Sequence, residues 1–89
     1  MSSEQDKIQK LVEEIALPPY ASADVRLGYD WTGDPAAYVM VTISDEEAKN
    51  KEFPEHAMQI DKLVADAFRE AEIALYPYVD FRSASDAAA

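Results

Sequence analysis

The stretch that decides the fold is residues 24–44, which read DVRLGYDWTGDPAAYVMVTIS. Apolar side chains alternate with polar or small ones on both sides of a turn at residues 32–35, and this predicts two strands, Asp24–Trp31 and Ala36–Ser44. Gly33 supplies a positive φ, and an Asp before a Pro favours a turn. Because the connection is short, we expect an antiparallel hairpin.

A helix is expected on the N-terminal side of this hairpin. Apolar residues recur there with helical spacing, at Ile8, Leu11, Val12 and Ile15. The pattern predicts an amphipathic helix from about Ser3 to Ala16. The pair at residues 18–19, Pro-Pro, ends it, because proline has no N–H to donate and restricts the residue before it.

A longer helix is expected on the C-terminal side. The run Ser44-Asp45-Glu46-Glu47 fits a capping box and opens a short charged turn. Pro54 suits the first position of the long helix, whose apolar stripe continues to about Leu75. A third strand is predicted at residues 78–83.

The element order is therefore α-β-β-α-β, which predicts an α+β fold: a two-layer sandwich with a three-stranded mixed sheet and two helices on one face. The long helix carries the chain back across the sheet, so the third strand should run parallel to the second. The strand orders 2-1-3 and 1-2-3 both remain open. We expect one domain over residues 1–82 and a flexible tail over 83–89.

The two predicted sheet faces differ in composition. The inner face should form the core, and its members are Val25, Leu27, Tyr29, Trp31, Val39, Val41, Ile43, Val79 and Phe81. The outer face carries residue types that are enriched at protein interfaces. We therefore predict a protein-binding surface built from Arg26, Tyr38, Met40, Tyr78 and Arg82. The alternatives are that these residues are simply exposed strand formers, or that the first helix covers this face.

Charge and composition exclude several function classes. The 89 residues include 18 acidic and 8 basic residues, a formal net charge of −10, and no Cys. A chain without Cys has no disulfide framework, zinc knuckle or thiol nucleophile. The negative charge disfavours direct binding to nucleic acid or to an anionic membrane. The acidic residues are spread over every expected element, which favours solubility and attraction to basic partners over dedicated nucleic-acid mimicry.

A small-ligand pocket near the hairpin turn is a second candidate site. It would use Tyr29, Asp30, Trp31 and Asp34. The spacing of these carboxylates does not match a calcium-binding loop, so we expect no metal and no cofactor.

Catalysis is the least favoured interpretation. The only histidine, His56, lies in the first turn of the long helix, where the helix dipole disfavours an imidazolium. A catalyst would have to combine it with Asp30 and Asp34, so we expect that the protein is not an enzyme.

The sequence thus predicts a small acidic module for protein interactions. It would act as a homodimer, or as an inhibitor-like or antitoxin-like binder of a basic protein. The N-terminal residues show no basic segment followed by an apolar one, so we expect a cytoplasmic protein. Accessory or small-ligand binding is the alternative function.

Overall fold

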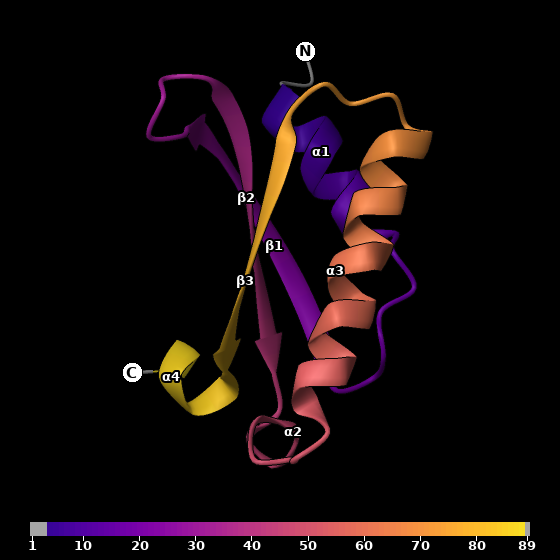
Figure 1. Cartoon of the computed structure of the whole chain (residues 1–89), viewed down its shortest axis with the longest axis vertical. Coiled ribbons are helices and arrows are strands. Elements are labelled where there is room, and N and C mark those ends of the chain that lie inside the picture. Colours follow the sequence, from indigo (N-terminus) through magenta and orange to yellow (C-terminus); the bar gives the residue numbers. More distant parts are fainter. Residues whose placement is uncertain (1–3, 89) are drawn as a thin grey trace.

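The computed structural model describes residues 4–88 and confirms the predicted α+β architecture (Figure 1). The short charged turn predicted after the capping box is the helix α2, and α4 is a further short helix that was not predicted. The elements in this part of the chain are α1 Glu4–Glu13, β1 Ala21–Tyr29, β2 Pro35–Ile43, α2 Asp45–Ala48, α3 Phe53–Glu70, β3 Tyr76–Ser83 and α4 Ala84–Ala88.

The sheet has the order β1-β2-β3, which decides between the two orders that the sequence left open. β1 runs antiparallel to β2, with Val25 opposite Val39. β3 runs parallel to β2, with Val79 also opposite Val39. The predicted hairpin and the predicted parallel third strand are both confirmed. β2 is therefore the central strand, and β1 and β3 form the two edges.

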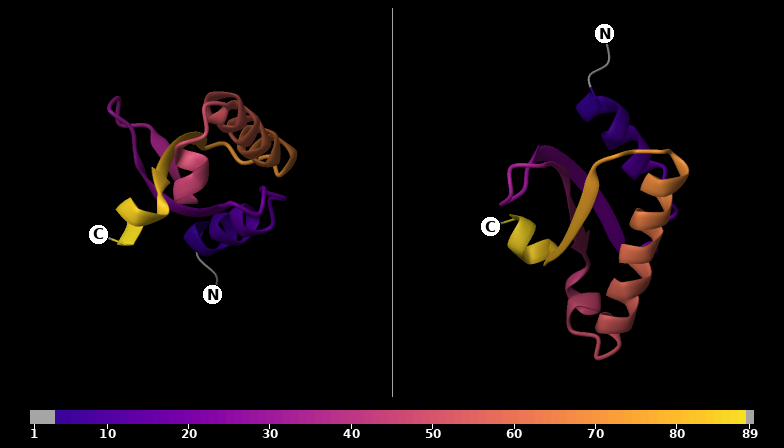
Figure 2. Two further views of the ribbon diagram at one scale, coloured as in Figure 1. Left: turned by 90° about the horizontal axis from the view of Figure 1, so that it is seen from below. Right: turned by 45° about the horizontal axis from the view of Figure 1, so that its top comes forward.

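Helices α1 and α3 lie on the same side of the sheet (Figure 1), and the view from below shows the same arrangement (Figure 2). Their apolar stripes pack against the inner face because burying those side chains removes them from water. The resulting core consists of Ile8, Val12, Val25, Ala37, Val39, Val41, Ile43, Ile60, Val64 and Phe68. The hairpin tip and α4 lie on the other side of the sheet, at its two ends.

Two residues predicted for the inner face do not belong to the core. Trp31 is 92% exposed and Tyr29 is 72% exposed. β1 covers Ala21–Tyr29 rather than Asp24–Trp31, so Trp31 belongs to the turn and Tyr29 ends the strand. The alternation of apolar and polar residues continues to Trp31, but the helices cover only the earlier part of β1. The prediction of these two side chains as core residues was wrong.

The edge of β1 is closed at Val25 and Leu27 by two glutamine side chains of α1. Gln5 Nε2 donates to the carbonyl oxygen of Val25 at 2.7 Å, and Gln5 Oε1 accepts from the N–H of Leu27 at 3.0 Å. Gln9 Oε1 accepts from the N–H of Val25 at 3.0 Å. These bonds replace a neighbouring strand, so α1 both covers the core and satisfies an exposed sheet edge.

The segment expected as a C-terminal tail contains α4. The N–H of Ser85 donates to the carboxylate of Asp45 at 3.0 Å, and its hydroxyl donates to the same carboxylate at 2.5 Å. These bonds join the end of the described chain to the start of α2.

Candidate functional site

The outer face of the sheet brings together all five residues that the sequence singled out for protein binding. Arg26, Tyr38 and Tyr78 occupy one cross-strand row, because Tyr38 is the register partner of both other residues. Met40 lies in the next row, and Arg82 in the row after it, opposite Thr42. Side chains at every second position point to the same face of a sheet, so the rows form one continuous surface.

This surface forms an open groove with a volume of about 840 Å³. Neither of the long helices covers it, since α1 and α3 both lie on the opposite face (Figure 1). The hairpin tip and α4 stand at its two ends (Figure 2). We call it the outer groove. Its lining residues are Asp24, Val25, Arg26, Tyr38, Val39, Met40, Tyr78, Val79, Asp80 and Arg82.

Three tyrosines form an aromatic cluster that begins in the outer groove and continues beyond it. The rings of Tyr38 and Tyr78 are stacked, with centroids 5.5 Å apart and an interplanar angle of 21°. Tyr76 packs against Tyr78 with a centroid distance of 4.7 Å. Gly28 leaves room for this stack, because a Cβ atom there would lie 3.3 Å from the ring of Tyr38. Aromatic pairs of this kind contribute about 0.5–1.5 kcal/mol beyond their buried area.

Tyr76 is a member that the sequence analysis missed. The strand was predicted to begin at Tyr78, after Pro77, whereas β3 begins at Tyr76. The available signal was the spacing, since residues two apart in a strand share a face. Tyr76 is 63% exposed and extends the aromatic surface beyond the groove.

The charged groups of the outer groove are available to a partner. Within residues 4–88, Asp24, Arg26 and Asp80 form no ion pair, and the pairs that do form join His56 with Glu47 and Arg69 with Asp66. Arg82 uses its Nε to donate to Thr42 Oγ1 at 2.9 Å. Two cations and two carboxylates thus face solvent beside the tyrosines. The face is locally balanced in a strongly acidic protein.

The hairpin tip is held at one end of the groove by several hydrogen bonds. Asp30 Oδ1 accepts hydrogen bonds from the N–H groups of Thr32 and Asp34 at 2.9 and 3.0 Å. The hydroxyl of Tyr78 donates to Asp30 Oδ2 at 3.2 Å, and the hydroxyl of Tyr38 donates to the carbonyl oxygen of Tyr29 at 2.6 Å. The stacked tyrosines therefore hold the tip against the sheet.

These contacts shift two pKa values. The pKa of Asp30 is lowered, chiefly by the hydrogen bond from the Thr32 side chain. The pKa of Tyr78 is raised, first by burial and then by its hydrogen bond to Asp30. The carboxylate of Asp30 thus already accepts hydrogen bonds that hold the tip in place. The other residues of the second candidate site, Tyr29, Trp31 and Asp34, lie at the same tip and are exposed.

His56 forms a polar cluster outside the groove. Its Nδ1 contacts Glu47 Oε1, and its ring stacks on Tyr20 with centroids 6.0 Å apart. The pKa of His56 is raised, mainly by the hydrogen bond with Glu47, which is the opposite direction to the one expected from the helix N-terminus alone. Glu47 itself is only 8% exposed. The cluster joins α2 to α3, and His56 contacts neither Asp30 nor Asp34 in the described part of the chain.

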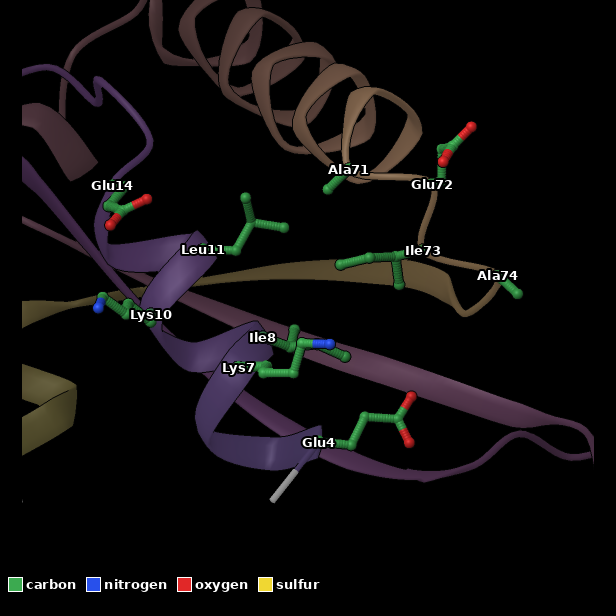
Figure 3. Close-up of a pocket in the computed structure, with 10 residues that line it drawn as sticks. All are labelled: Glu4, Lys7, Ile8, Lys10, Leu11, Glu14, Ala71, Glu72, Ile73 and Ala74. Atoms are coloured by element: carbon green, nitrogen blue, oxygen red, sulfur yellow. The ribbon is translucent and has the colours of Figure 1, made fainter. Parts of the chain in front are cut away.

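A second cavity, of about 730 Å³, lies between α1 and the segment after α3. Figure 3 shows Leu11 and Ile73 pointing toward each other across it, and Glu72 pointing away. Lys7, Lys10 and acidic side chains form its rim. The sequence analysis did not find it, because the apolar stripe of α1 does not show which of its members remain only partly covered.

Within residues 4–88, no three His, Asp or Glu side chains gather in a way that could hold a metal ion. No helix in that range has the length and apolarity needed to span a membrane. Comparison with protein-family models, curated proteins and solved structures found no match. Functional inference therefore depends on the geometry of the outer groove.

Proposed function

We propose that this protein is a small interaction module that binds a basic protein partner through the outer groove. One observation carries the proposal: Arg26, Tyr38, Met40, Tyr78 and Arg82 line a single open groove that α1 and α3 leave uncovered. Tyrosine and arginine are enriched among the residues that contribute most to binding energy at interfaces. A sheet face turned only toward solvent usually carries polar and charged residues, not aromatic ones.

The preorganised tyrosines support the same proposal. Tyr38 is 39% exposed, and both its ring and its hydroxyl are already held, by Tyr78 and by Tyr29. Binding then orders few additional side chains, which lowers the entropy cost of association. Rigid aromatic side chains next to adaptable polar ones are typical of surfaces that recognise proteins.

The charge of the chain favours a basic partner. The formal net charge is −10, and the carboxylates of Asp24 and Asp80 form no ion pair at the groove within the described residues. A field of one sign accelerates the encounter with an oppositely charged protein. The two arginines give the groove its own polarity, because they bind carboxylates of the partner in a defined orientation.

Tyr38→Asp tests the proposal in a binding experiment with the purified protein and the partner captured by it. We expect Tyr38→Asp to abolish capture while the far-ultraviolet circular dichroism spectrum stays unchanged. Met58→Asp is the matched control, because Met58 is 73% exposed on α3, on the opposite side of the sheet. Equal loss of capture in both variants would contradict a specific role for the groove.

Salt dependence tests the contribution of charge. We expect the association rate with the captured partner to fall steeply as ionic strength rises, because long-range attraction is screened over roughly 10 Å at 0.1 M salt. An association rate that does not change with salt would show that the partner is not selected by its positive charge.

Self-association through the same groove is the other form of this proposal. Light scattering distinguishes the two, since a face-to-face homodimer would have twice the mass of one chain and Tyr38→Asp would halve it. Binding of a small ligand at the hairpin tip has less support. Asp30 already accepts bonds from Thr32, Asp34 and Tyr78, and Trp31 projects into solvent.

A further inference from the structure

The two edges of the sheet are treated differently by the fold. Gln5 and Gln9 hydrogen-bond to three backbone groups at the middle of the β1 edge, the N–H and carbonyl of Val25 and the N–H of Leu27. Residues 76–82 of β3 pair with β2 on one side. On the other side, no backbone group or side chain within residues 4–88 bonds to their N–H or carbonyl groups. An unpaired strand edge of this kind is a template for another strand.

We propose that β3 pairs antiparallel with β3 of a second copy of this chain. The result is a six-stranded sheet across a twofold axis. This surface is the backbone edge of β3, which borders the outer groove and shares Asp80 and Arg82 with it. The pairing of strands does not require a partner in the groove, so the proposal does not depend on the proposed function. A twofold axis makes the contact isologous, which closes the assembly at a dimer.

The charges on β3 select one register. Asp80 and Arg82 share a face, since they are two residues apart in the strand. If Phe81 lies opposite Phe81 of the second copy, Asp80 of each chain lies opposite Arg82 of the other. Two reciprocal ion pairs form on the outer face, and opposite charges directly across a strand pair stabilise it.

The groups needed for this pairing are free. Asp80 has no hydrogen bond or ion pair within the described residues. Arg82 uses only its Nε, for Thr42, so the terminal nitrogens of the guanidinium remain available. Shifting the register by two residues places Asp80 opposite its own copy, and like charges directly opposite are destabilising.

A second copy would also add an apolar contact on the inner face of the sheet, at Phe81. Phe81 is half-buried and meets Phe53 of α3 edge-on, with ring centroids 5.5 Å apart. In the proposed register the two Phe81 side chains become a cross-strand aromatic pair on the inner face. Such pairs are among the favourable ones in antiparallel sheets.

Charge reversal tests the proposal by light scattering over a concentration series. We expect the wild-type chain to approach twice its monomer mass, and Asp80→Arg to shift the equilibrium to monomer by at least tenfold in the dissociation constant. The double variant Asp80→Arg/Arg82→Asp restores the ion pairs in reverse and should restore the dimer. Asp24→Arg is the matched control, because Asp24 lies in the same cross-strand row but on the closed edge.

Disulfide trapping tests the register. Because the sequence contains no cysteine, an introduced cysteine can form a disulfide only with another introduced one. Chains carrying Asp80→Cys, mixed with chains carrying Arg82→Cys, should form a disulfide between the two. Directly opposite residues lie about 4.5–5.5 Å apart, within the range that a disulfide spans. Asp80→Cys alone should not cross-link, because its diagonal separation is roughly 7–8 Å.

Three results would overturn the proposal. The first is a wild-type chain that stays monomeric at every concentration. The second is a dimer that Asp80→Arg leaves intact. The third is a dimer in which the Asp80→Cys chain fails to cross-link with the Arg82→Cys chain. A dimer that dissociates with Tyr38→Asp but not with Asp80→Arg would place self-association in the outer groove instead.

Discussion

The imidazole of His56, in the first turn of α3, contacts the largely buried carboxylate of Glu47 in α2. Glu47 Oε2 also accepts a hydrogen bond from the side chain of Asn50 at 3.3 Å. One carboxylate thus joins the two helices and the turn between them. Only one histidine is present in the chain, so its titration can be followed without interference from another imidazole.

We expect the stability of the protein to depend on pH through His56. Its pKa is raised in the folded state by the hydrogen bond to Glu47, so the folded protein holds this proton more tightly than the unfolded chain. The stabilisation is complete below the unfolded pKa of about 6.5. It is lost as pH rises through the higher folded pKa. Urea unfolding at a series of pH values checks this decline.

His56→Gln is the control for that experiment. The variant keeps a polar side chain but removes the titrating group, so its free energy of unfolding should change little with pH over the same interval. An identical pH slope in wild type and His56→Gln would contradict the assignment.

Glu72→Gly should stabilise the protein. Glu72 has φ of 56°, and it occupies the position after the C-cap of α3 where glycine is preferred. The N–H of Ile73 donates to the carbonyl oxygen of Phe68 at 2.9 Å, and that of Glu72 donates to Arg69 at 3.0 Å, as in a Schellman motif. Left-handed strain of about 1–2 kcal/mol would be relieved, against a glycine entropy cost of about 0.5–1 kcal/mol.

The expected net gain is about 0.5–1 kcal/mol, measured by thermal or urea unfolding. Lys62→Gly, at an exposed position inside α3, is the matched control and should destabilise by roughly the same amount. Destabilisation by Glu72→Gly would show that the Glu72 side chain contributes more than the backbone strain costs.

Gln5→Ala should lower the free energy of unfolding more than Gln9→Ala does, because it removes more of the hydrogen bonds to β1. Gln5 makes two hydrogen bonds to the strand and Gln9 makes one. At roughly 1 kcal/mol for each lost bond, the expected costs are about 2 and about 1 kcal/mol. Hydrogen exchange should accelerate at the amide of Leu27 in the first variant and at Val25 in the second.

Gln59→Ala is the reference for these two variants, because Gln59 is exposed on α3 and its side chain forms no hydrogen bond in the described structure. Its stability should differ from wild type by less than about 0.5 kcal/mol. Equal effects of all three substitutions would mean that the two glutamines act only through helix propensity.

The hairpin tip should loosen in acid. The pKa of Asp30 is lowered by its hydrogen bonds, first that from the Thr32 side chain, so its contribution is present above the unfolded value and is lost as pH falls through the folded value. Trp31 reports on the tip, since it is the only tryptophan and is almost fully exposed. Its fluorescence anisotropy should fall below about pH 3.9.

Asp30→Ala should show the low anisotropy at neutral pH, together with fast exchange of the Thr32 and Asp34 amides that it normally binds. Asp24→Ala removes an exposed carboxylate from β1, the strand that leads into the tip, and should change neither signal. A pH-independent anisotropy in the wild type would contradict a structural role for the Asp30 carboxylate.

Local patterns in the sequence were sufficient for the order of the two long helices and three strands and for the division of the sheet into two faces, but not for α4 or the exact strand ends. Alternation placed Val25, Val39 and Val41 inward and Tyr38 and Tyr78 outward, because successive strand residues point to opposite faces wherever the chain is extended. The Ser44 cap was also predicted, and its hydroxyl accepts from the N–H of Glu47 at 3.2 Å. Glu47, however, turns to Asn50 and His56 instead of returning to Ser44.

Only the tertiary structure decided which strand is central, that α1 covers the inner face, and that its glutamines close the edge of β1. It also placed Trp31 in solvent, since the extent of helix coverage, and not alternation, determines where a core ends. The binding of Asp30 by Tyr78, 48 residues away, has no local signature. Sequence periodicity reports the direction of each side chain, whereas the partner it meets depends on how distant elements pack.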